Sequence, residues 1–474
     1  MATSYLPITV IPTESFQTKA NCIQISRAIA SYFHILARPT IFLKIGRVCI
    51  EVNVEISDIP KNEVHLPSFL FSQFKIPNKA TKYLAKFIDE FNTLIVGPIV
   101  ALMTDSTETN YEPNFRSVHT FCEELHYHTQ QTGGLFYVFE SDDFSIDDIS
   151  GYYYNDGWKK HTFPPPDVVY NRIHSRKKER SDHFNKIKNE MTRLNIPFFN
   201  DRFLSKWDVH ELLIQEDHLQ PHLPETLLFT ETHFLELLNK HSSLFIKPIH
   251  GSQGRKILHL YKESHSFIVK VSTGTQSDDF MSFSNVERFF KWFSRFRKNT
   301  TYIIQQGIPL LLYKNRHIDF RVLCHKNLHN AWKVTSVVAR ISGEKQFVAN
   351  IARGGETYKP VKALTELFEK NVAIQQLVDM KELAREIATV ISNKTDGITG
   401  ELGLDIGIDQ DGKLWLIEVN SKPSKNFEEQ DVKIRPSTRA IMELCTTLAF
   451  EYKSKELEEN IHADLWIHDI KPEE

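Results

Sequence analysis

The chain is most informative at Gly403–Ile408 (GLDIGI) and Leu414–Asn420 (LWLIEVN), two apolar runs joined by the turn-rich segment DQDGK. A short polar turn with a glycine between two apolar runs predicts a β-hairpin. Glu418 and Asn420 share one face of the second strand, because side chains alternate along a strand. With a loop at residues 410–413, Asp409 pairs with Leu414 and Asp405 falls opposite Glu418, with Cβ atoms roughly 5 Å apart.

The three polar residues of this hairpin predict a metal site. Two opposed carboxylates repel each other unless a cation or a shared proton joins them. Asp405 and Glu418 with the amide of Asn420 form an all-oxygen set, which suits Mg²⁺ together with water and phosphate. Taken alone, the stretch fits equally well a solvent-facing polar edge on an ordinary hairpin.

A second stretch places a lysine and a glycine-bearing loop in sequence. Lys247 lies in the apolar run Leu244–Pro248, and the loop HGSQGRK follows at residues 250–256, before another strand-like run. Such a loop can lie over phosphates, because glycine lets backbone N–H groups approach the anion. The loop is not a Walker A motif, since the Gly-Lys-Ser/Thr ending is absent. On its own, a hairpin turn with a snorkelling lysine is the favoured alternative.

In this order, the pieces resemble the ATP-grasp superfamily of carboxylate–amine ligases. Thr301–Ile308 is similar to the hinge strand whose backbone contacts adenine, and Ile318–Leu323 to the "D-x-R" strand. Arg340 with Ala349–Gly355 resembles the "R…N-x-x-x-G-G" segment, and Glu418–Pro423 the closing "E-x-N-x-x-P". The resemblance spans residues 182–448. The closing segment and the long N-terminal extension are most similar to the endospore coat-associated (YheC/YheD-type) group.

The resemblance implies ATP and Mg²⁺ as cofactors and assigns roles to individual residues. Metal ligands are Asp405, Glu418 and Asn420; the arginines that bind the transferred phosphoryl group or the acceptor carboxylate are Arg321, Arg340 and Arg353; nucleotide contacts are Lys206, Lys247, Gly251, Ser252, Gly254, Gln305, Gln306, Ile308, Asp319 and Asn350. A surface or interdomain salt bridge is an alternative for each arginine. Lys206, at an expected helix start, fits a surface position equally well.

One position departs from the superfamily pattern. Members often carry an acidic residue a few positions after the hinge, where it holds the ribose hydroxyls. Residues 309–318 contain no Asp or Glu. Tyr313 or Asn315 could substitute through a hydroxyl or an amide contact.

Composition excludes several classes of protein. A chain of 474 residues, 41% hydrophobic and 25% charged, is typical of a soluble protein with two to four domains. A net charge of −3 gives no electrostatic case for nucleic acid. Five scattered cysteines without C-x-x-C spacing argue against a disulfide framework or a zinc site and for a reducing compartment. No apolar run approaches a membrane span and no secretion signal is visible, so we expect a cytoplasmic protein, compatible with spore-coat association.

The expected architecture is a multidomain α+β and α/β protein. Residues 1–90 form an N-terminal β-rich domain, and 91–181 a small pre-ATP-grasp α/β domain opened by one strand at Leu94–Met103. Residues 182–452 form the ATP-grasp domain, with a lid subdomain at about 222–308. Residues 453–474 form a charged C-terminal tail over the surface.

Two functional hypotheses follow. The first is an ATP- and Mg²⁺-dependent ligase that joins a small-molecule or peptide carboxylate to an amine, or to a thiol, through an acyl phosphate. The second is a spore coat-associated structural or interaction protein that retains a nucleotide site and has little turnover, with other coat proteins as partners. A protein kinase is a distant third, because the H-R-D…N and D-F-G motifs are absent.

Overall fold

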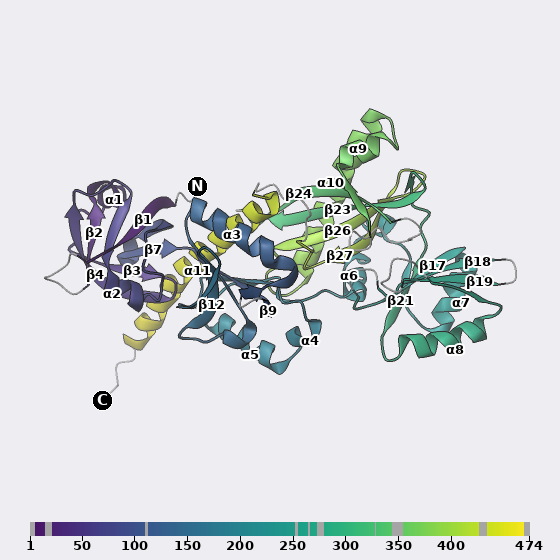
Figure 1. Ribbon diagram of the computed structural model, residues 1–474, viewed down its shortest axis with the longest axis horizontal. Coiled ribbons are helices and arrows are strands. Elements are labelled where there is room, and N and C mark those ends of the chain that lie inside the picture. The colour runs from purple at the N-terminus through teal and green to yellow at the C-terminus, as the bar shows by residue number, and fades with distance from the viewer. Residues whose placement is uncertain are drawn as a thin grey trace. The chain divides into compact units, whose positions relative to one another are not determined.

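The computed structural model describes residues 5–14, 21–109, 112–251, 255–263, 266–272, 279–327, 329–343, 354–425 and 434–468, the last helix without side chains beyond 456. The chain divides into two compact units (Figure 1). Unit 1 comprises Met1–Arg202 and Ser424–Glu474, and unit 2 comprises Phe203–Pro423. Unit 2 is therefore an insertion between two parts of unit 1.

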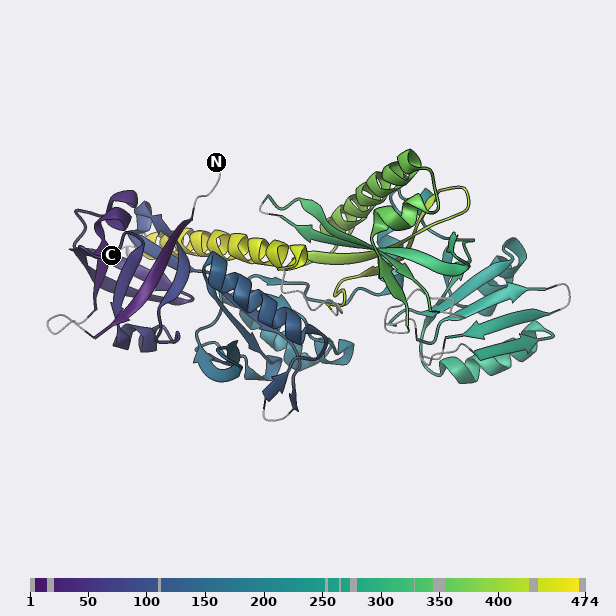
Figure 2. The ribbon, with the colours of Figure 1, turned by 45° about the horizontal axis from the view of Figure 1, so that its top comes forward.

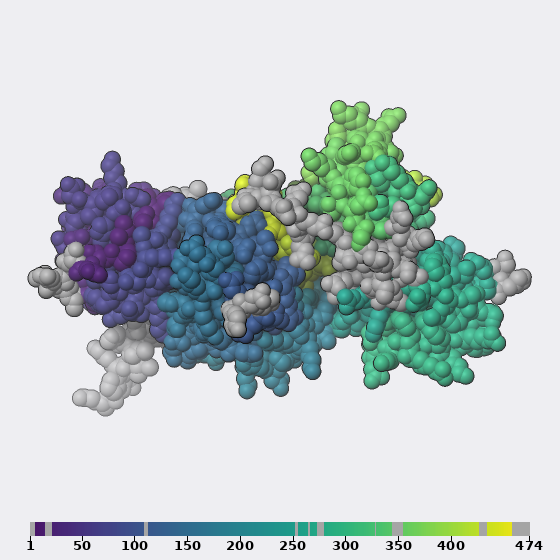
Figure 3. Space-filling view, viewed as in Figure 1, coloured from purple at the N-terminus to yellow at the C-terminus, as the bar shows by residue number. Residues whose placement is uncertain are grey.

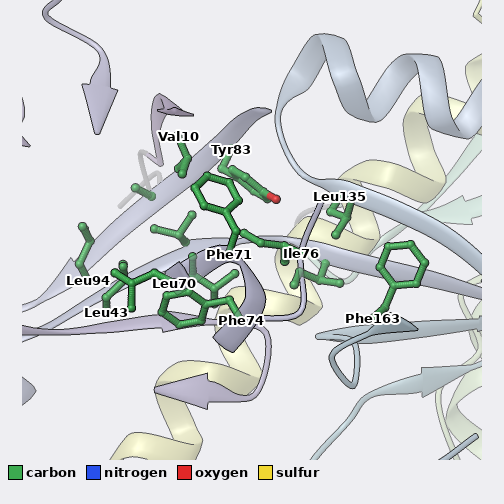
Figure 4. Packing of buried hydrophobic residues seen from close by; sticks show 14 of the residues in the cluster. Val10, Leu43, Leu70, Phe71, Phe74, Ile76, Tyr83, Leu94, Leu135 and Phe163 are labelled. Carbon is green, nitrogen blue, oxygen red and sulfur yellow. The ribbon is translucent and has the colours of Figure 1, made fainter. Parts of the chain in front are cut away.

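The N-terminal part of unit 1 is a closed barrel with strand order β1-β5-β2-β4-β3-β7-β6. Its elements are β1 (Leu6–Thr13), β2 (Cys22–Ser26), α1 (Arg27–Tyr32), β3 (Thr40–Ile45), β4 (Val48–Ser57), β5 (Glu63–Pro67), α2 (Ser68–Gln73), β6 (Thr81–Ile88) and β7 (Thr93–Gly97). Inward-facing aliphatic side chains fill it together with Phe71 from α2 and Phe74 just after that helix (Figure 4). Closure leaves no exposed sheet edge.

The second part of unit 1 is a six-stranded sheet of order β13-β12-β11-β8-β14-β15. Its elements are β8 (Ile99–Met103), α3 (His119–Thr132), β11 (Leu135–Phe139), β12 (Ile149–Tyr154), β13 (Trp158–Phe163), β14 (Val168–Asn171), α4 (Arg176–Glu179), α5 (Asp182–Arg193) and β15 (Phe198–Phe199), with the small hairpin β9 (Thr107–Thr109) and β10 (Glu112–Asn114). β8 runs parallel to both β11 and β14. Leu135 and Phe163 continue the buried cluster of the barrel into this sheet (Figure 4).

The boundary between these two parts differs from the expectation. The run Leu94–Met103 forms two strands rather than one, and β7, which was expected to open the second domain, closes the barrel. Pro98 separates the strands, and the Gly97–Pro98 peptide bond is cis. A proline lacks the N–H group that would continue a ladder, so the apolar run could not extend as one strand.

The C-terminal helix α11 (Pro436–His468) also differs from the expectation of a surface tail. Figure 2 shows it as one long helix that passes α3 and reaches the barrel, and in Figure 3 some of its yellow atoms are visible beside the blue atoms of unit 1. Lys453 is buried, with its Nζ 2.8 Å from Asp167 Oδ2. Glu456 Oε2 accepts hydrogen bonds from Lys44 at 2.9 Å and Arg47 at 2.8 Å. The described side chains of α11 as far as Glu456 therefore pack into unit 1.

Unit 2 contains a lid formed by the six-stranded sheet β16-β21-β17-β18-β19-β20. Its elements are β16 (Thr226–Leu228), α7 (Glu231–Lys240), β17 (Ser243–Pro248), β18 (Leu258–Lys262), β19 (Phe267–Val271), β20 (Asp279–Phe283), α8 (Val286–Arg297) and β21 (Tyr302–Gln306). Aromatic residues of α7 and α8, among them Phe234 and Phe289, pack on one face of the sheet with Leu244, Leu260 and Val269. No helix among the described residues of the lid covers the opposite face.

The other part of unit 2 is a sheet of order β25-β24-β23-β26-β27 with β22 attached to β23. Its elements are α6 (Lys206–Leu213), β22 (Leu312–Tyr313), β23 (Arg316–Lys326), β24 (Trp332–Ile341), β25 (Glu356–Tyr358), α9 (Pro360–Thr365), α10 (Lys370–Lys394), β26 (Glu401–Ile408) and β27 (Leu414–Asn420). Alternate residues of β23 (Ile318, Phe320, Val322) are buried in one cluster with Leu383 and Ile387 of α10. The intervening residues, among them Asp319 and Arg321, therefore lie on the opposite face.

Candidate active site

The hairpin β26–β27 brings Asp405 opposite Glu418, as its sequence predicts. The register nearer the turn was predicted wrongly: Ile408, not Asp409, pairs with Leu414. A β-bulge at Ile417 adds one residue to β27 and restores the expected pairing at Asp405. Leu416 therefore lies in the core with Leu414, while Glu418 lies on the other face. Bulges commonly redirect a side chain next to a functional site.

A pocket in unit 2 lies among α6, the lid and β27. Its polar side chains are Lys206, His210, Thr226, Lys247, Gln305 and Glu418; its apolar lining is Val209, Leu213, Leu223, Pro224, Ile303, Leu416, Ile417 and Val419. An apolar wall with a few converging polar groups is the usual composition of a small-molecule site. Lys206, Lys247, Gln305 and Glu418 were all predicted as site residues from the sequence, so the structure brings these four together.

Lys206 is held at the start of α6 by a capping box. The Ser205 hydroxyl accepts a hydrogen bond from the Asp208 N–H at 3.0 Å, and the Asp208 carboxylate accepts one from the Ser205 N–H at 3.2 Å. Lys206 Nζ donates to Glu418 Oε1 at 2.9 Å and to the Gly251 carbonyl at 3.3 Å. The side chain is thus directed at the hairpin carboxylate rather than at the surface.

Lys247 is buried on β17 and donates a hydrogen bond to Gln305 Oε1 at 2.6 Å. Burial lowers the pKa of Lys247 to about 8, although the carboxylate of Glu418 acts in the opposite direction. Among the described residues no carboxylate forms an ion pair with Lys247, and a lysine of this kind that faces a pocket is suited to bind an anion. A phosphate bound there would raise this pKa again.

The expected adenine hinge needs one correction. β21 is an interior strand between β16 and β17, so its backbone groups are not free to read a ligand. The N–H of Gln306 donates to the Glu225 carbonyl at 2.8 Å, and that of Gly307 to the Ser243 carbonyl at 2.8 Å. The side chain of Gln305 instead lines the pocket, bonded to Lys247 and, at 2.9 Å, to Thr226. Ile308 lies just after the strand and does not line the pocket.

The "D-x-R" strand contributes a chain of ion pairs across the sheet. Arg340 Nε and Nη2 lie 2.6 and 2.8 Å from the two oxygens of Asp319, and Arg340 Nη2 lies 3.0 Å from Asp405 Oδ2. Arg321 binds both oxygens of Asp405. The strand register explains this arrangement, because Asp319 pairs with Arg340 and Arg321 pairs with Asp405.

These ion pairs act differently on the two aspartates. Burial raises the pKa of Asp319, which shares Arg340 with a second carboxylate, that of Asp405. Burial also acts to raise the pKa of Asp405, but the guanidinium groups of Arg321 and Arg340 outweigh it and hold this pKa below the usual range. Of the two aspartates, Asp405 is therefore the one that stays ionised to lower pH.

The donor set of the hairpin fits a magnesium ion by its chemistry. Its oxygen ligands are two carboxylates and the amide oxygen of Asn420. The Nδ2 of this amide, a donor that cannot bind a cation, is buried without a hydrogen-bond partner among the described residues. No group of three or more His, Cys, Asp or Glu side chains in the described ranges is arranged for a metal ion. Arg321, Arg340 and Lys206 neutralise Asp405 and Glu418 in this state, so a bound metal would exchange with these side-chain cations.

Several predicted site residues are not placed in the pocket. Ser252, Gly254, Asn350 and Arg353 lie outside the described residues. The two suggested ribose ligands do not line the pocket: the Tyr313 hydroxyl donates to Glu366, and Asn315 is exposed in the turn before β23. Among the residues that the sequence missed, Thr226 is the most informative. It is polar and buried at the start of a strand beside the expected hinge.

Comparison with known proteins identifies the family. The pattern of the "YheC/D like ATP-grasp" family matches residues 195–448. The endospore coat-associated protein YheD of Bacillus subtilis is 28% identical over 397 residues, covering 82% of this chain and 85% of that protein. The endospore coat-associated protein YheC of the same organism is 23% identical over 297 residues, covering 62% of this chain and 80% of YheC.

Solved structures show weaker similarity. The D-alanine-D-alanine ligase from Coxiella burnetii is 11% identical with a TM-score of 0.43, covering 77% of this chain and 99% of that one. VanG D-Ala:D-Ser ligase from Enterococcus faecalis is 12% identical with a TM-score of 0.44, and the match covers 75% of this chain and 99% of that one. Similarity at this level says nothing about a substrate. Within the described part of the chain, no helix is both long enough and apolar enough to cross a membrane. The chain belongs to the YheC/D-like ATP-grasp family and has the ATP-grasp fold.

Proposed function

We propose that this protein is an ATP- and Mg²⁺-dependent ligase that activates a carboxylate as an acyl phosphate for attack by an amine or a thiol. The observation that supports it most is the pocket in which two lysines, Lys206 and Lys247, face Glu418, with Asp405 directly opposite Glu418 in the sheet. Such an arrangement offers cations for phosphates and carboxylates for a divalent metal. An apolar wall beside it, including Leu213 and Ile303, suits a nucleobase.

Each group of residues has its own role in this reaction. Lys247 and Lys206 bind the phosphates of ATP, and Gln305 with Thr226 offers side-chain hydrogen bonds to the base. Asp405, Glu418 and Asn420 would hold Mg²⁺, which supplies neutralisation of phosphate charge. Arg321 and Arg340 stabilise the transferred phosphoryl group or hold the acceptor carboxylate. Positioning and charge neutralisation are the main requirements of phosphoryl transfer.

The reaction balances in two steps. An oxygen of the carboxylate attacks the γ-phosphorus, the bond to the β-phosphate oxygen breaks, and ADP leaves. The amine then attacks the acyl carbon, the bond to the phosphate oxygen breaks, and inorganic phosphate and one proton are released.

A second function is favoured by one observation. Asp405 and Glu418 are both engaged by side-chain cations, as they would be in a protein that has kept the fold and lost turnover. The names of the relatives YheD and YheC point to an association with the spore coat. We therefore keep as an alternative a coat-associated binding protein with little turnover.

ADP release separates the two. Purified protein is mixed with Mg-ATP and a panel of amino acids, peptides and cell-wall precursors, and ADP and phosphate are measured. The ligase predicts release that depends on an added acceptor and is lost in Lys247→Met, but kept in Lys381→Met, an exposed position on α10. Nucleotide binding without release under any acceptor would support the alternative. Absence of nucleotide binding would overturn both.

A further inference from the structure

The face of the lid sheet opposite α7 and α8 carries one row of side chains that crosses all six strands. The register pairs Thr226 with Gln305, Gln305 with Phe245, Phe245 with His259, His259 with Lys270, and Lys270 with Phe280. Residues paired in this way lie side by side on the same face. With strands about 4.8 Å apart, the row is roughly 24 Å long.

The row is a continuous stack of rings and cations. The Phe245 and His259 rings are stacked with centroids 3.9 Å apart, and the neighbouring Tyr261 ring lies 4.0 Å from His259. Lys247 Nζ lies 5.2 Å from the centre of the Phe245 ring. Lys270 Nζ lies 4.9 Å from the Tyr261 ring and 5.3 Å from the Phe280 ring. These contacts fix the rings and both ammonium groups on one surface.

The row is most exposed at the edge of the sheet: Gln305, Phe245 and Lys270 are half-buried, and Phe280 is exposed. Thr226 and Gln305 line the pocket, and His259 is only 6% exposed. Phe280, on the last strand, is 63% exposed. The row therefore begins inside the nucleotide pocket proposed above and ends in solvent. The outer end of the row, with Lys270 and Phe280, is thus accessible to a ligand.

This face carries positive charge and, on the described strands, no negative charge. Its residues are Thr226, Leu228, Ser243, Phe245, Lys247, His259, Tyr261, Ile268, Lys270, Phe280, Ser282, Ile303 and Gln305. Lys270 has no acidic partner within the described ranges. Burial lowers the pKa of His259 and of the adjacent His317, so the charge at neutral pH comes from Lys247 and Lys270.

The amount of charge indicates the class of ligand. A single nucleic-acid strand carries one phosphate per roughly 3.4 Å, or about seven along this row, and two lysines would leave most of them without a partner. An extended peptide of about seven residues covers the same length at roughly 3.3 Å per residue. Two acidic side chains would match the two lysines, and apolar groups would pack against the outer edges of the rings between them.

We infer that the carboxylate substrate of this protein is an acidic peptide that lies extended along this row outward from Lys247 to Phe280, with Gln305 and Thr226 left to the nucleotide. The inference rests on the proposed ligase function, and it adds a substrate class and a surface outside the nucleotide pocket. The acid nearest Lys247 would then be the one beside the phosphates of ATP. The acid at the other end would pair with Lys270.

Fluorescence anisotropy with the full-length protein tests this surface without turnover. The probe is a fluorescein-labelled random copolymer of glutamate and tyrosine, compared with polyglutamate, a lysine–tyrosine copolymer and a single-stranded oligothymidylate. We expect the glutamate–tyrosine copolymer to bind most tightly. Lys270→Met, which keeps the aliphatic stem, should weaken its binding about tenfold, and Lys270→Glu should weaken it further.

Lys291→Glu is the matched control, because Lys291 is exposed on α8, on the side of the lid away from the row. Its binding should equal that of the wild type. Phe280→Ser should weaken binding several-fold without a change in melting temperature, since Phe280 is exposed.

Each outcome decides the inference. Equal binding by wild type and both Lys270 variants would overturn it, as would tighter binding of the oligothymidylate than of the peptide. Stabilisation by Mg-ATP, measured on the same proteins, keeps the two proposals apart. If Mg-ATP stabilises the protein and the peptide does not bind, only the peptide surface falls. If the peptide binds and ADP is never released, the ligase function falls and the surface stands.

Discussion

Glu418 faces Asp405 across the hairpin, yet its Oε1 lies 2.9 Å from the ammonium of Lys206, a residue more than two hundred positions earlier in the chain. The repulsion between the two carboxylates is therefore offset by protein cations, with Arg321 and Arg340 on Asp405 and Lys206 on Glu418. Binding of a metal and a nucleotide at this place would redistribute these pairs rather than fill an open cage.

The first prediction concerns Glu418→Gln. The substitution keeps the volume of the side chain and removes one carboxylate, so it should abolish ADP release and the stabilisation by Mg-ATP. The ligand-free protein should keep its melting temperature to within a few degrees, because a partly exposed ion pair contributes only about 0–1 kcal/mol. Glu382→Gln, at an exposed position on α10, is the control. Equal stabilisation of both variants by Mg-ATP would contradict the metal site.

The second prediction separates two neighbouring glutamines. Gln305 contacts Lys247 and Thr226 in the pocket, whereas the Gln306 side chain accepts only the Glu225 N–H at 3.3 Å. Gln305→Ala should weaken binding of a non-hydrolysable ATP analogue about tenfold, the loss of roughly one buried hydrogen bond. Gln306→Ala should leave the Kd nearly unchanged. Titration calorimetry compares them, and a larger effect of Gln306→Ala would refute this assignment.

The third prediction is a pH dependence of nucleotide binding. Burial lowers the pKa of Lys247 to about 8, so the free protein loses this charge above pH 8, whereas bound phosphate favours the charged form. Binding then takes up a proton, and the Kd for the ATP analogue should rise up to tenfold per pH unit above about 8. Lys247→Arg, which stays charged, should show a flat profile. The same slope in both proteins would exclude Lys247 as the source.

The fourth prediction concerns the stability of unit 1. Lys453 and Asp167 form a buried pair, with side chains 3% and 0% exposed. Lys453→Met leaves the buried carboxylate with one hydrogen-bond donor among the described residues, the Ile99 N–H at 2.7 Å, and should cost about 3–5 kcal/mol in free energy of unfolding.

Adding Asp167→Asn to Lys453→Met should restore part of that loss, since no buried charge remains. Urea denaturation followed by tryptophan fluorescence measures both variants. If the double variant is less stable than Lys453→Met, with the two losses in free energy of unfolding adding up, the two side chains act independently.

The hairpin shows how far the sequence could predict the site. Alternation along β27 predicted the shared face of Glu418 and Asn420, and the turn predicted the hairpin. The bulge at Ile417 was not predicted, although the sequence indicates it. The spacing between the core residues Leu414, Leu416 and Val419 changes from two positions to three. A strand that keeps all three of these residues buried on one face must contain one extra residue.

Other predictions were wrong because contacts with segments far away in the sequence determine the structure. Leu94–Met103 is uniformly apolar and buried, so its composition could not show that Pro98 divides it between two sheets. The charged segment from Lys453 onward was expected on the surface, because a buried lysine needs a partner that only the fold provides, here Asp167. The backbone of the hinge strand was expected to be free, and β16 pairs with it.

The insertion of unit 2 into unit 1 has a consequence for biosynthesis. The two ends of unit 2 meet, with the Leu204 N–H 3.2 Å from Ser421 Oγ and Lys422 Nζ 4.5 Å from the centre of the Phe203 ring. The ribosome must therefore complete the whole insert before α11 emerges, a delay of roughly 10 to 45 seconds at ordinary translation rates. Throughout that time the nascent barrel and its neighbouring sheet lack Lys453 and Glu456, the counter-charges for Asp167, Lys44 and Arg47. Unit 2 can fold as soon as it is made, whereas the first part of the chain to be synthesised is the last to be finished.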